Sequence, residues 1–234
     1  MSREVDDLLE CLRTFGAAVY RDGHSISIQG PLNADNCSYS VAVDATYCGT
    51  VAMASAMTGR TAQLPSESAI RMKAIIPLLC AIGLKAEAID DGIVLSGSLR
   101  SPVVVETGDS PAFPSDLVPP LMALLTQVHG ESRIIERVYP GRFDHVAGLV
   151  SMGADCSVTC NEARVVGGKT LSGSRVQGTG IRETAALLLA ALNAQGTTEI
   201  SNAAALARGY EDLPGDLAFA GADVKMSSTD GATF

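Results

Sequence analysis

The hydrophobic pattern of the chain repeats one arrangement of apolar helix, strand, second helix and hairpin. Two independent series of glycines mark the repeat. The first series ends three apolar helical segments, at Gly59, Gly130 and Gly196, with steps of 71 and 66 residues. Each glycine of the second series lies just before a strand. These glycines are Gly16, Gly83, Gly153 and Gly221, and they are separated by 67, 70 and 68 residues. Two markers with one period predict a repeated unit of two helices and about four short strands.

Three segments are apolar on all sides: 52–59, 121–130 and 184–196. A helix without a polar face is buried all round. We therefore expect a central bundle of these three helices, with strands and amphipathic helices outside. This pattern predicts an α/β domain with approximate threefold internal symmetry. Because Gly16 has no apolar helix before it, the chain is expected to start inside a repeat and to be part of something larger.

The remaining pattern predicts the outer elements. Amphipathic helices are expected at 5–15, 70–82 (with a kink at Pro77), 143–152 and 213–220. In the first of them, one face carries Val5, Leu8, Leu9, Leu12 and Phe15. Hairpins are expected to pair 18–20 with 25–28, 85–89 with 93–95, and 156–159 with 164–166. A last strand is expected at 223–226, followed by a turn in D-G-A-T-F.

Composition limits the classes of function. Of the 234 residues, 47% are hydrophobic and 18% are charged, which favours a packed core in one large domain or two small ones. The net charge of −9 argues against a nucleic-acid partner. No apolar run approaches a membrane span and no signal peptide precedes the first helix, so a cytoplasmic location is expected. The six cysteines form no Cys-x-x-Cys pair and are interpreted as reduced core thiols; no metal and no cofactor are expected.

Four charged residues fall where the pattern places a helix start or a loop: Asp116, Arg142, Arg182 and Arg208. If the buried helices run parallel, the starts of the second and third share one end of the domain, where unpaired N–H groups attract anions. Three arginines and a carboxylate there would suit an anionic substrate and one acid–base group.

Each of these residues also has a structural interpretation. Asp116 could be only an N-cap. Arg142 and Arg208 could be surface residues, and Arg182 could form a solvated pair with Glu183. His129 and His145 are interpreted as structural, because both lie in a helical context.

Several motifs resemble the enolpyruvyl transferase family, of the UDP-N-acetylglucosamine 1-carboxyvinyltransferase type. They are A-F-P-S-D-L at 112–117, I-I-E-R-V-Y-P-G-R-F-D-H-V at 134–146, I-R-E-T-A-A-L-L-L-A-A-L from 181, and A-L-A-R-G-Y-E-D-L at 205–213. The family fold has two domains of three βαβαββ units each, with a catalytic cleft between them. The resemblance implies that residues 1–37 are a remnant of the other domain. Residues 38–234 then form one enolpyruvyl transferase domain with three repeats.

The resemblance also implies an activity. Members move the enolpyruvyl group from phosphoenolpyruvate to the 3′-hydroxyl of UDP-N-acetylglucosamine, in peptidoglycan precursor synthesis. By motif position, Asp116 matches the base at the sugar hydroxyl and Val138 a backbone contact to the sugar nucleotide. Arg142, Arg182 and Arg208 match arginines that face phosphate and carboxylate groups. Asp116 and Arg208 are thus the expected catalytic pair.

The chain departs from the family in two ways. The Lys-Asn pair and the cysteine loop of the other domain are not found, and Gly180 stands where the family often has aspartate. We therefore expect the C-terminal half of the transferase, inactive alone, whose partners include the missing N-terminal domain or a second copy. Two alternatives stay open: a non-catalytic module that binds an anion or a nucleotide sugar, and a 3-phosphoshikimate 1-carboxyvinyltransferase. F-P-S-D and A-R-G-Y-E-D resemble the sugar-nucleotide branch more closely than the shikimate branch.

Overall fold

The computed structural model describes residues 3–31, 37–108 and 111–227, and it divides the chain into two compact units, Met1–Asp44 and Ala45–Phe234. The assignment of residues 1–37 to another domain of the family stays a prediction. In the described parts of the chain, no helix has both the length and the apolar character needed to cross a bilayer.

The first unit consists of one helix and the expected hairpin. Helix α1 spans Arg3–Thr14, and strands β1 (Ala18–Asp22) and β2 (Ser25–Gln29) pair antiparallel. Of the apolar residues expected on one face of α1, Leu9 is buried, whereas Leu8 is 56% exposed. The helix therefore buries a narrower apolar stripe than the pattern predicts.

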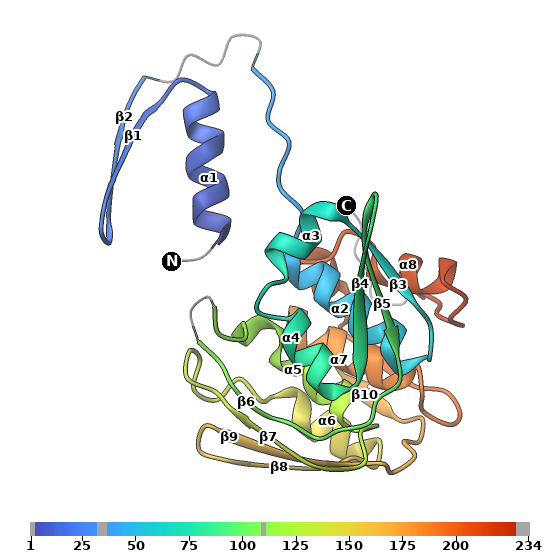
Figure 1. Cartoon of the computed structure of the whole chain (residues 1–234). Helices are drawn as coiled ribbons and strands as arrows, with labels where there is room; N and C mark the ends of the chain where they lie inside the picture. Colours follow the sequence, from blue (N-terminus) through green and yellow to red (C-terminus); the bar gives the residue numbers. More distant parts are fainter. Residues whose placement is uncertain (1–2, 32–36, 109–110, 228–234) are drawn as a thin grey trace. The chain divides into compact units, whose positions relative to one another are not determined.

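The core of the second unit is a bundle of three apolar helices, as expected. Helices α2 (Ala45–Met57), α5 (Val118–Leu125) and α7 (Ile181–Ala191) pack on one another. Every residue of α5 is buried. Each helix begins three to seven residues before its predicted start, because its first turn carries polar residues or prolines that the apolar criterion leaves out. The three-stranded and the four-stranded sheet of this unit lie outside the bundle (Figure 1).

The sheets follow the repeat. In the first sheet, β5 (Gly92–Gly97) pairs antiparallel with β3 (Ala62–Pro65) on one side and with β4 (Leu84–Ile89) on the other. The second sheet has the order β6-β7-β9-β8. Its strands are β6 (Val104–Glu106), β7 (Gly130–Ile135), β8 (Asp155–Thr159) and β9 (Glu162–Gly167). Strands β6 and β7 are parallel and the others antiparallel, which gives a β-α-β-α-β-β unit.

The third repeat has fewer strands. Strand β10 (Arg175–Gln177) pairs parallel with β11 (Glu199–Ser201), and helix α8 spans Leu213–Phe219. The strand expected at 223–226 is irregular backbone in the structure, because no partner strand lies beside it among the described residues. The turn expected in D-G-A-T-F lies outside the described residues.

A second correction concerns the helix expected at 70–82. It is two helices, α3 (Ser66–Arg71) and α4 (Ile76–Ile82), separated by a turn. Pro77 lies in the first turn of α4 rather than at a kink. Proline has no N–H and clashes with the carbonyl four residues earlier, so the chain breaks before it and starts again with proline in the first turn.

Helix α6 (His145–Ser151) joins the second sheet to the bundle, since it contacts both β8 and α7. It is shorter than the predicted helix at 143–152. Only Cys48 of the six free cysteines is buried, and Cys37, Cys80 and Cys160 are exposed. The interpretation of the thiols as core residues is therefore wrong for most of them.

The seven marker glycines all have positive φ angles, between 67° at Gly59 and 131° at Gly83. Six of them follow a helix within a few residues, and Gly130 follows the turns after α5. A residue in this conformation ends a helix and redirects the chain toward the next strand, and glycine adopts it without a Cβ penalty. The repeat seen in the sequence therefore marks the places where the chain leaves a helix and turns toward the next strand.

His145 lies in the core and should make stability depend on pH. It is 1% exposed, its Nε2 lies 3.2 Å from the Met122 sulfur, and burial lowers its pKa to about 3. The unfolded chain binds a proton near pH 6.5, whereas the folded chain does not, so stability is complete above that pH and falls as the pH drops toward 3. Between pH 7.5 and 5.0, urea denaturation should show a loss about 2 kcal/mol larger in the wild type than in His145→Leu.

The exposed His129 provides the matched control. His129→Leu should keep the pH dependence of the wild type. An equal loss of stability in the wild type and in His145→Leu would contradict the assignment of this pH dependence to His145.

Candidate functional site

The second and third buried helices begin close together, as predicted. Asp116 lies in the single 3-10 turn Ser115–Leu117 that leads into α5, and Arg182 lies in the first turn of α7. The Nη2 atom of Arg182 lies 3.5 Å from Oδ2 of Asp116. The side chains of Arg182 and Asp116 are 18% and 43% exposed, so the pair lies at the edge of the core and remains open to solvent.

Arg142 completes this group from the loop before α6. Its guanidinium forms an ion pair with Oδ1 of Asp116 and donates a 3.3 Å hydrogen bond to Ser115. The ring of Tyr139 lies beneath it, with 4.1 Å between Cζ and the ring centroid. Asp116 makes no side-chain cap to either helix, so the N-cap interpretation is wrong. We call Asp116, Arg142 and Arg182 the Asp116 cluster.

Tyr210 extends the cluster to the first buried helix. The Cζ of Arg182 lies 5.2 Å from the centroid of the Tyr210 ring, which is 2% exposed. The hydroxyl of Tyr210 lies 3.0 Å from that of Thr50, and its ring lies 5.5 Å from that of Tyr47, both on α2. Burial, followed by the hydrogen bond to Asp216, holds the pKa of Tyr47 well above its usual range, so this phenol stays neutral.

The cluster has a surplus of positive charge and an unused donor. Two guanidiniums face one carboxylate, and the Nη1 atom of Arg182 is buried without a hydrogen-bond partner in the described parts of the chain. A buried donor without an acceptor typically costs about 1–3 kcal/mol. Because an anionic ligand would supply the missing acceptor, the geometry favours recognition of a phosphate or carboxylate at this end of the bundle.

A buried carboxylate holds the loops around the cluster in place. Glu136 follows β7, is 0% exposed, and accepts four hydrogen bonds. The donors are the Thr107 and Ser115 hydroxyls at 2.7 and 2.8 Å and the Val138 and Tyr139 backbone N–H groups at 2.7 and 3.0 Å. Burial by itself raises the pKa of Glu136, but these hydrogen bonds outweigh it and the pKa lies below its usual value.

Glu136 was not singled out from the sequence. I-I-E-R looks like ordinary strand alternation, and only the fold turns this residue inward. Ser115 precedes Asp116 and receives a hydrogen bond from Arg142, so Glu136 connects through Ser115 to the cluster. Tyr210 was within a quoted motif, A-R-G-Y-E-D, but its side chain was not recognised as part of the site.

The other two predicted site residues, Val138 and Arg208, form no ion pair or side-chain hydrogen bond with the cluster in the described parts of the chain. The N–H of Val138 is donated to the carboxylate of Glu136. Arg208 is exposed at the end of the 3-10 helix Ala203–Arg208, two residues before Tyr210. Among the described residues, no ion pair connects Arg208 to the cluster. The structure thus brings together Asp116, Arg142 and Arg182, whereas Arg208 has no ion-pair partner within the described ranges.

Glu183 occupies the space beside Gly180. A Cβ atom at position 180 would collide with the carboxylate of Glu183. Arg182 forms its ion pair with Asp116 rather than with Glu183, so the interpretation of Arg182 and Glu183 as a solvated pair is wrong.

Comparisons with known proteins agree with this architecture. The family model of EPSP synthase (3-phosphoshikimate 1-carboxyvinyltransferase) matches residues 1–217. A UDP-N-acetylglucosamine 1-carboxyvinyltransferase of Wolbachia pipientis (strain wPip) is 38% identical and aligns with 96% of this chain and 53% of its own. One from Caulobacter vibrioides is 36% identical, with coverage of 97% and 54%. The chain therefore spans about half the length of the curated relatives it matches.

Solved structures support the fold. The enolpyruvyl transferase NikO from Streptomyces tendae superposes with a TM-score of 0.80 at 26% identity, covering 96% of this chain and 55% of that one. An EPSP synthase from Acinetobacter baumannii has a TM-score of 0.54 at 20% identity and covers 69% of this chain and 39% of its own, which is a likeness of fold alone. The expected fold of repeated βαβαββ units is confirmed.

The four hydrogen bonds to Glu136 predict a large effect of its removal. Glu136→Ala should lower the free energy of unfolding by on the order of 3 kcal/mol, because it leaves buried donors without an acceptor. Glu136→Gln keeps one acceptor oxygen and should cost about 1 kcal/mol. The matched control is Glu106→Ala, which removes an exposed carboxylate paired with Arg137 and should cost about 1 kcal/mol or less. Urea denaturation measures all three, and equal losses for Glu136→Ala and Glu106→Ala would contradict the role given to Glu136.

Proposed function

The chain belongs to the EPSP synthase family of enolpyruvyl transferases, and on that premise we propose that it is the C-terminal half of a UDP-N-acetylglucosamine 1-carboxyvinyltransferase. The reaction transfers the enolpyruvyl group of phosphoenolpyruvate to the 3′-hydroxyl of the sugar nucleotide and releases phosphate. It would serve peptidoglycan precursor synthesis. The curated relatives that carry this name, at 36–38% identity, support this acceptor over shikimate 3-phosphate.

The observation that carries the proposal is the Asp116 cluster at the start of the buried helices. Both substrates are anionic, and the cluster presents two guanidiniums, one of which has an unused buried donor. In this proposal, Arg142 and Arg182 bind the phosphate and carboxylate groups. Asp116 accepts the proton of the sugar hydroxyl, and the two arginines hold its carboxylate in position.

Arg208 and Val138 have supporting roles in the proposal. Arg208 is exposed and has no partner among the described residues, so it is free to reach a substrate phosphate. Val138 offers its carbonyl to the nucleotide sugar, since its N–H is already donated to Glu136. The catalytic pair is thus Asp116 and Arg208, with Val138, Arg142 and Arg182 completing the binding set.

A second candidate function is a non-catalytic module that binds an anion or a nucleotide sugar. The observation that favours it is that Arg142 and Arg182, which can hold an anion, are already in place at the Asp116 cluster. Both candidates predict ligand binding at the Asp116 cluster, and turnover separates them. Turnover would require the complementary half, or a second copy of this chain, on the open side of the cluster.

We expect no transferase activity from this chain alone. Groups aimed at developing charge typically contribute about 10²–10³ in rate each, and the Lys-Asn pair and cysteine loop of the family are not found in the sequence. Phosphate release from phosphoenolpyruvate and UDP-N-acetylglucosamine measures this directly. Release above background would contradict the expectation and favour a self-sufficient homodimer.

We expect UDP-N-acetylglucosamine and inorganic phosphate to bind at the Asp116 cluster. Arg182→Ala should weaken binding by about tenfold or more, because charge-assisted hydrogen bonds contribute about 1.5–3 kcal/mol. Arg182→Lys should recover little, since an ammonium group cannot replace the planar guanidinium fork. Isothermal titration at two salt concentrations should also show weaker binding at the higher one.

The control variant is Arg175→Ala, which removes an arginine that is 86% exposed and paired with Glu199. It should bind both ligands as the wild type does. Equal affinities of the wild type and Arg182→Ala would show that the ligand binds elsewhere.

A further inference from the structure

The two arginines of the Asp116 cluster both lie on tyrosine rings, but the two rings differ in burial. Tyr139, beside Arg142, is 55% exposed. Tyr210, beside Arg182, is 2% exposed, and the centroid of its ring lies 5.2 Å from the guanidinium carbon. A ring face within about 6 Å attracts a cation, and the attraction is stronger where water is excluded. The buried ring of Tyr210 is therefore the stronger support.

The ring of Tyr210 is fixed at both ends. The backbone N–H of Tyr210 donates a 2.9 Å hydrogen bond to the carbonyl of Leu206. Its hydroxyl lies 3.0 Å from the hydroxyl of Thr50, which donates its own proton to the carbonyl of Thr46 at 2.8 Å. Because a threonine hydroxyl has a single proton, Tyr210 is the donor to Thr50. The tip of the ring is thus bound to helix α2, and its base is held by its own chain.

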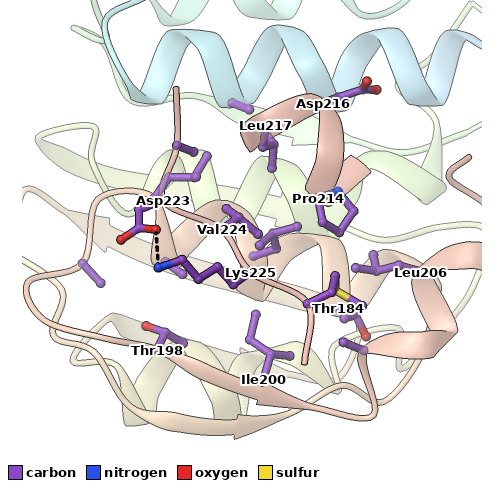
Figure 2. A pocket seen from close by; sticks show the side chains of 18 of the residues that line it. Thr184, Thr198, Ile200, Leu206, Pro214, Asp216, Leu217, Asp223, Val224 and Lys225 are labelled. Atoms are coloured by element: carbon purple, nitrogen blue, oxygen red, sulfur yellow. Dashed lines mark ion pairs between the residues drawn. The ribbon is translucent and has the colours of Figure 1, made fainter. Parts of the chain in front are cut away.

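Helix α8, which follows Tyr210, is also held to α2. Tyr47, in the first turn of α2, donates a hydrogen bond to the carboxylate of Asp216 in α8, and its ring lies 5.5 Å from that of Tyr210. Leu206 and Asp216 line a groove of about 1260 Å³ beside β11, with Asp216 next to α2 (Figure 2). Tyr210 does not line this groove, and its ring lies against Arg182 instead.

The guanidinium of Arg182 has a neighbour on three sides. Its Nη2 lies 3.5 Å from Asp116, the Tyr210 ring covers one face, and Gly209 lies beside Nη1. A Cβ atom at position 209 would be 3.1 Å from Nη1 and 2.7 Å from the side chain of Ile181, so glycine leaves room for the guanidinium. Nη1 is buried and has no hydrogen-bond partner in the described parts of the chain. Packing against the ring and the backbone, rather than a hydrogen bond of its own, therefore sets the direction of this donor.

We propose that Tyr210 is the positioning residue of Arg182. Its ring holds the guanidinium plane so that Nη2 stays on Asp116 and Nη1 stays the donor for an oxyanion. Recognition of an oxyanion by the planar guanidinium fork requires one fixed orientation, which a freely rotating side chain loses. This role rests on the anion binding proposed above for the Asp116 cluster, and it adds a residue that touches no substrate.

The first test uses the full chain without a ligand. In NMR spectra, an arginine whose guanidinium is held shows separate signals for its two Nη groups, whereas a freely rotating one shows a single averaged signal. Arg182, identified by the loss of its signals in Arg182→Ala, should show separate signals in the wild type and in Tyr210→Phe, which keeps the ring. In Tyr210→Leu the signals should merge. Separate signals in Tyr210→Leu, or merged signals in the wild type, would overturn the proposal whatever the chain binds.

The second test measures the binding of inorganic phosphate to the full chain by isothermal titration. Tyr210→Leu should weaken binding by about fivefold or more, and Tyr210→Phe by less than about twofold. The double variant Arg182→Ala/Tyr210→Leu should bind phosphate as Arg182→Ala does, because the ring acts only through Arg182. Additive losses in the double variant would show that Tyr210 affects binding by another route, which contradicts a positioning role.

Leu213→Ala is the matched control for lost packing. Leu213 is 0% exposed and lies three residues after Tyr210, at the start of α8. This variant should unfold at a lower urea concentration than the wild type but keep its phosphate affinity and the separate Arg182 signals. An equal loss of affinity in Leu213→Ala and Tyr210→Leu would assign the effect to general packing. If Tyr210→Leu does not fold, Tyr210→Met fills more of the same space without a ring face and gives the same readings.

The failure of this proposal can be distinguished from the failure of the proposed function. Unchanged phosphate affinity in Arg182→Ala would overturn the anion site itself, and with it the role of Tyr210 in anion binding. A loss in Arg182→Ala with none in Tyr210→Leu would overturn the role of Tyr210 alone. Merged Arg182 signals with unchanged phosphate affinity in Tyr210→Leu would show that the orientation of the guanidinium is not needed for binding, which also overturns it.

Discussion

The burial of three helices without a polar face is the constraint on which the rest of the structure depends. Helices α2, α5 and α7 have no continuous polar face, so they pack on one another and are covered on most of their outside. The sheets and the amphipathic helix α6 provide this cover. Because the three helices are equivalent in the repeat, their starts come to the same end, where Tyr47, Asp116 and Arg182 are linked through Tyr210 and the ion pairs.

The charged groups at this end are stabilised by the elements that cover the bundle. Glu136 is fully buried at the end of β7, and its four hydrogen bonds connect the strand, the loop at Thr107, the turn at Ser115 and the backbone before Arg142. A buried carboxylate is tolerated only when donors surround it, and here they do. The hydrogen bonds to Glu136 thus hold the backbone of the site in place. The charged groups of the Asp116 cluster, which lie nearer the surface, stay available to a ligand.

The repeat accounts both for the position of the Asp116 cluster and for the open strand edge in the third repeat. In two repeats, a hairpin closes the sheet beside the strand that follows the buried helix. In the third, the edge of β11 and the groove beside it lack this strand among the described residues. The Asp116 cluster supports an anion-binding role for the domain.

The sequence by itself determined the repeat, the buried bundle, the hairpins and the family, because these depend on local chain properties. Glycines that must adopt positive φ, such as Gly83 and Gly153, are recognisable at any distance from their partners. The motifs around Asp116 and Arg182 could also be recognised from the sequence, and so could the charged residues proposed for the site.

Only the tertiary structure decided which of these groups meet. Asp116 forms ion pairs with Arg142 and Arg182, 26 and 66 residues away, but none with Arg208 among the described residues, and no local pattern encodes this choice. Glu136 and Tyr210 became site residues because packing turned them inward. Residues 223–226 have the composition of a strand but no partner among the described residues, and a strand forms only when a second one satisfies its backbone. Helix and turn propensities are local, whereas pairing and charge complementarity require the whole fold.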